Sequence, residues 1–441
     1  MTLAQRPRWL RWPGGRRTTL RAEFETLALA LLSGQGEASG VALAARLLAA
    51  YAALSENERR SFFALLSTRF GPDLEALKRA LAEFERRPDA AAAGRLHAAA
   101  EPRRQELIRR MNLAPNGTHQ LVRMREQLLA AMREEPSLAA VDADFRHLFS
   151  SWFNRGFLVL RRIDWSTPAH VLEKIIRYEA VHEITSWDDL RLRLEPPDRR
   201  CFAFFHPALD GEPLIFVEVA LTQVMPESIA PLLQGRGMPV APKRATTAVF
   251  YSISNCQAGL RGVSFGNFLI KQVAEDLKRE LPSLDTFVTL SPLPGFGRWL
   301  AAARHDDAGV LSVGDRAALG EFDREGWHLR PSLALREALS RAATRYLFEA
   351  KDEAGKPLDP VARFHLGNGA RLERLDWLGD VSARGLEQGA GFMVNYLYDL
   401  ASVERNHEAF ANLAEIVASP ALRRLHRRGV ADMAAAANKR R

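Results

Sequence analysis

The segment with the clearest chemical potential is a glycine-rich loop that follows a predicted strand. Residues 251–267 read YSISNCQAGLRGVSFGN, with three glycines at positions 259, 262 and 266 and Arg261 between them. Glycine lets the backbone approach a ligand closely, and the free N–H groups at the start of a helix attract an anion. We expect that helix to open at about Val263. The loop therefore favours a binding site for a pyrophosphate.

A second interpretation of this loop stays open. No GK[ST] sequence follows it, so it is not a Walker loop, and it does not match a clean dinucleotide fingerprint. A plain strand-to-helix turn, with glycines needed only for close packing, explains the same residues. Spacing alone does not separate phosphate binding from packing.

The loop lies in a half of the chain that alternates strands and helices. We expect a helix over His170–Tyr178 and a strong amphipathic helix over Val263–Leu281. The buried face of the second helix is predicted to carry Ile270, Val273, Ala274, Leu277 and Leu281. Runs rich in β-branched and aromatic residues predict four strands: Cys201–His206, Leu214–Thr222, Thr246–Ser254 and Thr286–Leu290. A mixed sheet covered by helices follows.

The preceding half of the chain reads as helix after helix. Apolar residues recur at helical spacing in five segments: Phe24–Leu32, Gly40–Leu54, Glu56–Phe70, Asp73–Glu85 and His119–Glu134. Ser55 with Glu58 forms a capping-box pattern, and Asn116-Gly117 and Glu135-Pro136 mark breaks. We predict three parts: a basic, disordered tail over residues 1–17, a helical bundle over 18–165 and a catalytic domain over 166–441.

Composition limits the classes of function. The 441 residues are 47% hydrophobic and 26% charged, with a net charge of +8, typical of a globular protein with an anionic partner or of an arginine-rich composition alone. No apolar stretch is long enough to span a membrane, and no RRM, KH or zinc-finger pattern occurs. We expect neither a membrane nor a nucleic-acid partner.

Cysteine and histidine usage argues against disulfides and metals. The two cysteines, Cys201 and Cys256, form no CxxC pair, and the 11 histidines show no HxxxH or HExxH spacing. We expect no metal site and a reducing cytoplasmic environment. The arginine-rich start of the chain leaves import into the mitochondrial matrix as the alternative.

Several sequence blocks, in order, closely resemble the malonyl-CoA decarboxylase family. They are HPALDGEPLIFVEVALT (206–222), FYSISNCQAGLRGVSFGNFLIK (250–271), LSPLPGF (290–296), PVARFHLGNGA (360–370) and NYLYDL (395–400). Together they span most of residues 200–400. The resemblance implies an α+β protein, in which an N-terminal all-α bundle precedes a GNAT-type (acetyltransferase-like) mixed-sheet catalytic domain that binds acyl-CoA.

The resemblance also implies the site. In the family, the stretch that matches residues 261–267 contacts malonyl-CoA, which here means Arg261, Gly262, Val263, Ser264, Phe265, Gly266 and Asn267. Ser291 and His365 match the catalytic pair, and both would touch substrate. Tyr398 matches a tyrosine near the site. Homo-oligomers, expected to be tetramers assembled through the helical domain, are a further implication.

Each of these residues also has a purely structural interpretation. Ser291 followed by Pro292 is a natural helix N-cap, and a lone histidine such as His365 is usually structural. Ser252 and Ser254 are rival serines that we expect to line the cofactor groove. His206, His407 and Asp380 are second-rank candidates.

The implied reaction needs no cofactor. Loss of carbon dioxide from malonyl-CoA leaves an electron pair that the thioester carbonyl accepts as an enolate, so neither metal nor organic cofactor is required. An acid with a pKa near 7 would suit the final protonation of carbon. We expect His365 to polarise the substrate and supply the proton, directly or through water, and Ser291 to bond the carboxylate or relay protons. Alternatives are a GNAT-type N-acyltransferase and a non-catalytic CoA-binding scaffold.

Overall fold

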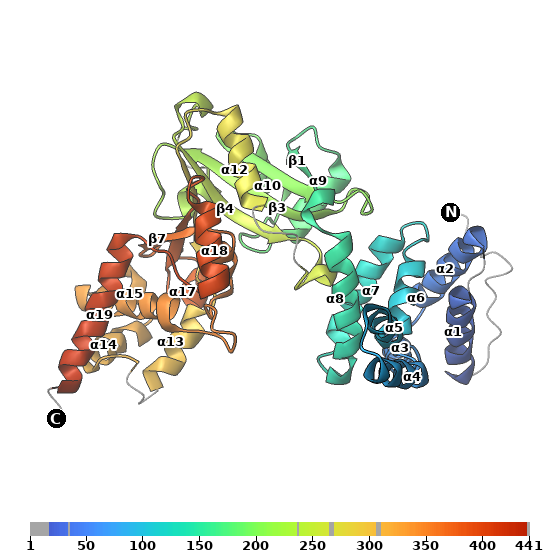
Figure 1. Ribbon diagram of the computed structural model, residues 1–441. Helices are drawn as coiled ribbons and strands as arrows, with labels where there is room; N and C mark the ends of the chain where they lie inside the picture. Colours follow the sequence, from blue (N-terminus) through green and yellow to red (C-terminus); the bar gives the residue numbers. More distant parts are fainter. Residues whose placement is uncertain (1–16, 34–35, 236–237, 264–268, 306–309, 439–441) are drawn as a thin grey trace. The chain divides into compact units, whose positions relative to one another are not determined.

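The computed structural model describes residues 17–33, 36–235, 238–263, 269–305 and 310–438 (Figure 1). The predicted basic tail, except for its last residue, and the loop residues Ser264, Phe265, Gly266 and Asn267 lie outside this part. The chain divides into two compact units. The first comprises Met1–Leu158, His206–Asp210 and Gln257–Phe265, and the second comprises Val159–Phe205, Gly211–Cys256 and Gly266–Arg441. In the described part, no helix has the length and apolar character that crossing a bilayer requires.

The first unit is helical, as predicted. Its helices are α1 (Arg17–Leu32), α2 (Glu37–Ala52), α3 (Glu56–Arg69), α4 (Leu74–Arg86), α5 (Ala90–Ala100), α6 (Arg103–Met111), α7 (Gly117–Ala131) and α8 (Ala139–Trp152). The Ser55 capping box is confirmed, because the Glu58 carboxylate accepts the Ser55 N–H at 2.8 Å. Asn116 adopts a left-handed conformation directly before α7, which confirms the predicted break.

In the described part of the chain, the second unit is built on an eight-stranded mixed sheet in the order β1-β2-β3-β4-β5-β8-β6, with β7 also paired to β8. Its strands are β1 (Val159–Ile163), β2 (Arg199–Phe205), β3 (Pro213–Thr222), β4 (Thr247–Asn255), β5 (Thr286–Thr289), β6 (Ser291–Pro292), β7 (Arg371–Asp376) and β8 (Met393–Leu397). Neighbours run antiparallel except β4 and β5, which are parallel. A bulge in the β3–β4 pairing gives β4 an extra residue, Tyr251. The four predicted strands are thus confirmed, as is the α+β class.

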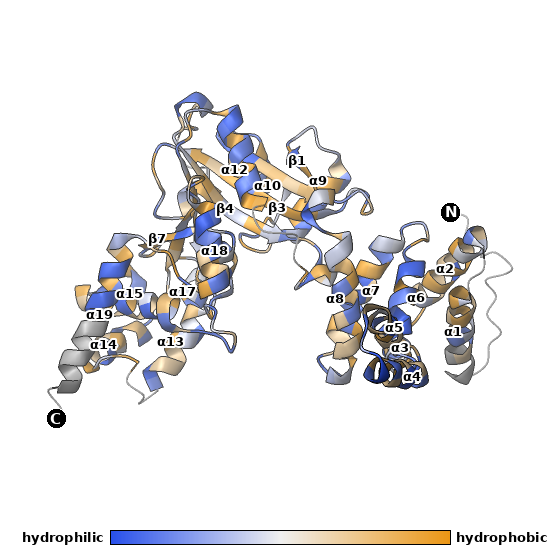
Figure 2. Ribbon diagram, viewed as in Figure 1, coloured by the Kyte–Doolittle hydropathy of each residue, from blue (hydrophilic) through white to orange (hydrophobic). Residues whose placement is uncertain are grey.

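Helices cover the sheet, whose strands β2 and β3 are buried along nearly their whole length and are coloured largely as hydrophobic in Figure 2. Helices α9 (Ala169–Tyr178) and α10 (Trp187–Leu194) pack on β2 and β3 through one cluster that includes Leu172, Leu190 and Phe216. Helix α12 (Leu269–Glu280) buries the predicted face. Val263 precedes the described start of that helix and is not helical, because it still belongs to the turn after Ala258–Leu260.

The remaining helices of the described chain belong to the second unit. They are α11 (Ala230–Leu233), α13 (Phe296–His305), α14 (Val313–Ala318), α15 (Leu333–Glu349), α16 (Pro360–Gly367), α17 (Ala383–Gly389), α18 (Val403–Leu413) and α19 (Pro420–Asn438). Helix α15 packs against both α14 and α19 (Figure 1). Helix α16 and strands β4 and β6 are the elements that carry the pocket described below.

Candidate active site

Ser291 lies at the point where β5 passes into β6. Its backbone pairs with Val394 of β8, so it is a strand residue and not the N-cap of a helix. The next helix, α13, begins only at Phe296, after a second proline and glycine. The helix-cap interpretation is therefore wrong, because the first proline sits at a strand end, where its missing N–H is tolerated. The strand fixes the Ser291 hydroxyl in a buried position.

His365 lies in α16, one turn from its start. Asp359 caps this helix by accepting the N–H groups of Val361 and Ala362 at 3.0 and 2.8 Å, and Pro360 occupies the first helical position. Asp359 also accepts the Tyr346 hydroxyl at 3.3 Å. The helix that carries the imidazole is thus anchored at its N-terminus to α15.

The predicted pair is brought into direct contact. The Ser291 Oγ lies 3.0 Å from His365 Nε2, and His365 Nδ1 lies 2.8 Å from the Tyr398 hydroxyl. On its other side, Ser291 Oγ donates to Thr289 Oγ1 at 2.9 Å. Three residues that are far apart in the sequence therefore join one hydrogen-bonded chain with a fourth, Thr289.

Burial decides the protonation states in this chain. It lowers the pKa of His365 to about 3 and raises the pKa of Tyr398 well above its usual value. At neutral pH the imidazole is uncharged and the phenol keeps its proton. One assignment satisfies every group: Tyr398 donates to Nδ1, Nε2–H donates to Ser291, and Ser291 donates to Thr289. The free protein therefore does not hold the acid of pKa near 7 that we expected, because His365 is fully desolvated.

This neutral histidine predicts a pH dependence of stability. An unfolded histidine has a pKa of about 6.5, so below that pH the unfolded state binds a proton that the folded state does not. The folded state therefore loses up to about 1.4 kcal/mol per pH unit from His365 between pH 6.5 and its folded pKa of about 3. Urea unfolding at pH 7 and pH 5 should show a smaller loss for His365→Gln than for the wild type. Equal losses would contradict the assignment.

Sequence reasoning did not identify Thr289, Tyr396 and Asp359 as parts of the site. Thr289 Oγ1 accepts both the Ser291 hydroxyl and the Tyr396 N–H at 3.2 Å. The Tyr396 ring stacks on the His365 imidazole with 4.6 Å between centroids. The position of Tyr396 two residues before Tyr398 in the sequence was a usable signal for Tyr396. Asp359 precedes Pro360, which is a helix-start pattern.

A cavity of about 340 Å³ opens onto this pair. Ser291 and His365 contribute polar groups to its wall, and β4 contributes Phe250, Tyr251, Ile253 and Asn255. The rest of the lining is Val181, Pro292, Pro360, Val361 and Phe364. A small, mostly apolar pocket with a few convergent polar groups is the usual form of a small-molecule site.

The described part of the glycine loop belongs to the first unit. Arg261 and Gly262 are exposed, Val263 is buried, and Gly262 has a positive φ of 75°. Arg146 Nε lies 3.8 Å from the position that a Gly262 Cβ would occupy. Two exposed cations therefore stand at this turn, as an anion site requires.

Gly259 of the same loop serves packing. A Cβ at this position would lie 1.9 Å from the Val122 carbonyl oxygen of α7, and Arg125 Nη1 donates to the Gly259 carbonyl at 2.7 Å. Gly259→Ala should therefore destabilise the protein by about 1–3 kcal/mol. Gly94→Ala in α5, where nothing lies within 4 Å, is the matched control and should be neutral or stabilising. Thermal unfolding measures both, and equal melting temperatures for the two variants would contradict the packing role.

The other candidates lie away from the pocket. Ser252 and Ser254 do not line it, because both hydroxyls bond to the Glu179 carboxylate. His206 Nδ1 accepts the Ala208 N–H, and its ring packs on Phe153. His407 bonds to the Gly367 carbonyl, and Asp380 accepts the Ser382 N–H. Among the described residues, no group of three or more His, Cys, Asp or Glu side chains is placed to hold a metal ion.

In the described part of the chain, a mixed sheet whose strands β4 and β5 run parallel, together with a buried hydroxyl–imidazole contact in a pocket lined by β4, is the arrangement of an α+β enzyme with a small-molecule site. Family models agree with this class. Residues 156–438 match the model of the malonyl-CoA decarboxylase C-terminal domain, and residues 70–153 match that of the N-terminal domain. The chain belongs to the malonyl-CoA decarboxylase family.

Individual relatives give the same picture. The structure of malonyl-CoA decarboxylase from Rhodopseudomonas palustris is 57% identical with a TM-score of 0.88, covering 92% of this chain and 99% of that one. The enzyme of the same name from Agrobacterium vitis is 55% identical with a TM-score of 0.87 and the same coverage. Mitochondrial malonyl-CoA decarboxylase from Anser anser anser is 36% identical over 345 residues, which is 72% of this chain and 68% of the goose protein.

Proposed function

We propose that this enzyme converts malonyl-CoA into acetyl-CoA and carbon dioxide, with neither a metal nor an organic cofactor. The observation that carries the proposal is the 3.0 Å contact between Ser291 and His365 at the wall of a small pocket. The family membership supports the substrate. Because the thioester accepts the electron pair of the breaking C–C bond, the protein has to supply only binding, hydrogen bonds and a proton.

The Ser291 hydroxyl and the His365 imidazole hold the malonyl group by hydrogen bonds. The bond to the carboxyl carbon then breaks, its electron pair moves onto the thioester as an enolate, and carbon dioxide leaves. Donors at the developing enolate oxygen are worth about 3–4 kcal/mol each. A proton then adds to the enolate carbon that carried the carboxyl group. This step gives the acetyl group, and each turnover consumes one proton.

We propose that His365 takes up its proton in the substrate complex, because burial lowers the pKa of the free imidazole to about 3. A malonyl carboxylate beside the imidazole favours the charged form, since an opposite charge within about 4–6 Å raises the pKa of a histidine. His365 therefore gains its proton with the substrate and can return it to carbon. Tyr398, which keeps its own proton, orients the ring throughout.

A direct assay separates this proposal from an N-acyltransferase. The protein is incubated with malonyl-CoA labelled in the free carboxyl group, with no acceptor amine. Release of labelled carbon dioxide without an amine is the expected result. Turnover only when an amine is added would favour acyl transfer, and CoA binding without turnover would favour a scaffold.

We also propose that Arg261, Gly262 and Val263 bind the phosphates of CoA. The exposed guanidinium of Arg261 lies on a glycine turn beside Arg146. Two neighbouring positive charges support the binding of a polyanion at this turn. Arg261→Ala should raise KM for malonyl-CoA by about 10-fold, the worth of one charge-assisted hydrogen bond. The matched control is Arg155→Ala, another exposed arginine of the first unit. An equal change in both variants would mean that only net charge matters.

Assembly and location complete the proposal. We infer a homo-oligomer formed through the helical unit, and light scattering on the purified chain should give a mass at a multiple of the monomer. A mass equal to one chain would contradict it. A cytoplasmic site of action is supported by the higher identity to the two bacterial enzymes than to the mitochondrial one.

A further inference from the structure

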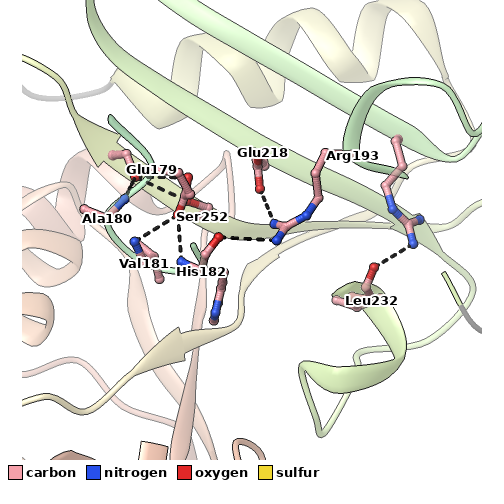
Figure 3. Close-up of polar contacts among 10 residues, drawn as sticks. Glu179, Ala180, Val181, His182, Arg193, Glu218, Leu232 and Ser252 are labelled. Atoms are coloured by element: carbon pink, nitrogen blue, oxygen red, sulfur yellow. Dashed lines mark hydrogen bonds and ion pairs between the residues drawn. The ribbon is translucent and has the colours of Figure 1, made fainter. Parts of the chain in front are cut away.

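One wall of the pocket is a segment with neither helix nor strand, Ala180–His182. It follows α9, and Val181 is its contribution to the pocket lining. His182 is buried, Val181 is half-buried and Ala180 is exposed. Backbone that is withdrawn from water usually satisfies its polar groups through helix or sheet bonds. Here side chains supply the partners instead (Figure 3).

The three N–H groups of the segment all meet buried side-chain oxygens. Glu179 Oε1 accepts the N–H of Val181 at 2.9 Å and that of His182 at 2.7 Å, while the Ala180 N–H donates to Ser254 Oγ at 3.2 Å. The Glu179 carboxylate is held in turn by β4. The Ser252 hydroxyl lies 2.8 and 2.7 Å from its two oxygens, and Ser254 donates to Oε2 at 3.2 Å.

The three carbonyl groups meet two arginines. Arg384 of α17 donates to the Ala180 and Val181 carbonyls at 3.0 and 3.4 Å, and Arg193 of α10 donates to the His182 carbonyl at 3.3 Å. Arg193 is itself fixed by a buried ion pair with Glu218 of β3 at 2.7 Å (Figure 3). Every backbone polar group of the segment is therefore anchored to a side chain on a regular element or on Glu179.

Burying the Glu179 carboxylate to hold this segment costs desolvation free energy, so we infer that the position of the segment matters for function. A buried carboxylate has to recover its lost hydration through several hydrogen bonds, and a half-satisfied network is worse than an apolar core. What this network fixes in the pocket is the side chain of Val181. Valine is β-branched and restricted at χ1, so a fixed backbone leaves its side chain few positions in the pocket.

We propose that Val181 is a specificity-determining residue that limits the room for a substituent on the malonyl carbon, and that Glu179 is its positioning residue. The inference rests on the proposed decarboxylation. The enzyme would therefore prefer malonyl-CoA to a 2-methylmalonyl thioester because the added methyl group meets the Val181 wall. Adding or removing one methylene in an apolar pocket typically changes discrimination by about 10–200-fold.

The test compares kcat/KM for the two thioesters in the full-length protein. Val181→Ala should raise the ratio of methylmalonyl-CoA to malonyl-CoA by about 10-fold or more. Glu179→Gln, which keeps shape but removes the charge, should raise the same ratio by less. Ser252→Ala removes a hydroxyl that holds Glu179 without altering the carboxylate, and it should move the ratio in the same direction. A purely structural role would lower both kcat/KM values together and leave the ratio unchanged.

Thr247→Val is the matched control, since Thr247 is a buried hydroxyl residue of the same strand and is not a partner of Glu179. Its ratio should equal that of the wild type. An unchanged ratio in Val181→Ala, with a wild type that decarboxylates malonyl-CoA, overturns the inference and leaves the proposed function intact. No decarboxylation by the wild type overturns both. A shift in Val181→Ala alone, with folded but unshifted Glu179→Gln and Ser252→Ala, overturns the positioning role of Glu179.

Discussion

Replacing His365 by asparagine should lower kcat for malonyl-CoA decarboxylation by about 10²–10⁴-fold, the usual contribution of a positioned acid–base group. Asparagine can still donate a hydrogen bond toward Ser291, but it cannot gain and return a proton. The loss should therefore fall on the chemical step. CoA affinity should stay within a few-fold of the wild type, because the predicted phosphate contacts lie on another loop.

His407→Asn is the matched control for that variant. His407 does not line the pocket. Its Nδ1 bonds to the Gly367 carbonyl at the end of the same helix, α16. Stopped assays of carbon dioxide release and equilibrium binding of CoA measure both variants. If His365→Asn kept its full kcat, the imidazole would not be part of the chemistry. If it lost CoA affinity and kcat together, a folding defect would explain the result.

Local sequence patterns allowed four strands of the second unit and its helices α9 and α12 to be predicted, and left β1, β6, β7 and β8 unpredicted. Strands β2 to β5 follow from runs of apolar residues of the right length, and the turn before β3 follows from Asp210-Gly211. The register and the strand order do not follow, because pairing depends on contacts between residues far apart in the chain. The meeting of β5, β6 and β8 is such a case, and it decides where Ser291 lies.

In the site too, some features can be predicted from neighbouring residues in the sequence, whereas others depend on tertiary contacts. Asp359-Pro360 predicts a helix start from local chemistry alone. The four-residue chain from Thr289 to Tyr398 joins two strands and a helix, so neither Thr289 nor the stacking of Tyr396 can be read from spacing. Ser291-Pro292 misleads for the same reason: the local signal is that of a helix cap, and the tertiary pairing with β8 overrides it.

Replacing Ser291 by alanine is the second large effect that we expect. It removes the hydroxyl that connects His365 to Thr289, so kcat should fall by about 10²–10³-fold, as when one donor to a developing oxyanion is lost. It also leaves His365 Nε2 without its described partner and Thr289 Oγ1 with only the Tyr396 N–H, which should cost about 1–3 kcal/mol of stability in urea unfolding. Measurement of kcat and of the unfolding midpoint on the same preparation separates the two effects.

The double variant gives the sharper form of this prediction. Suppose that Ser291 and His365 act as one unit on the malonyl group. The kcat of the double variant, Ser291→Ala with His365→Asn, should then be close to that of the less active single variant, because the second change removes a function that is already lost. Independent residues would instead multiply their losses in kcat. A multiplicative result would mean that the 3.0 Å contact between them is structural, and that each group meets the substrate separately.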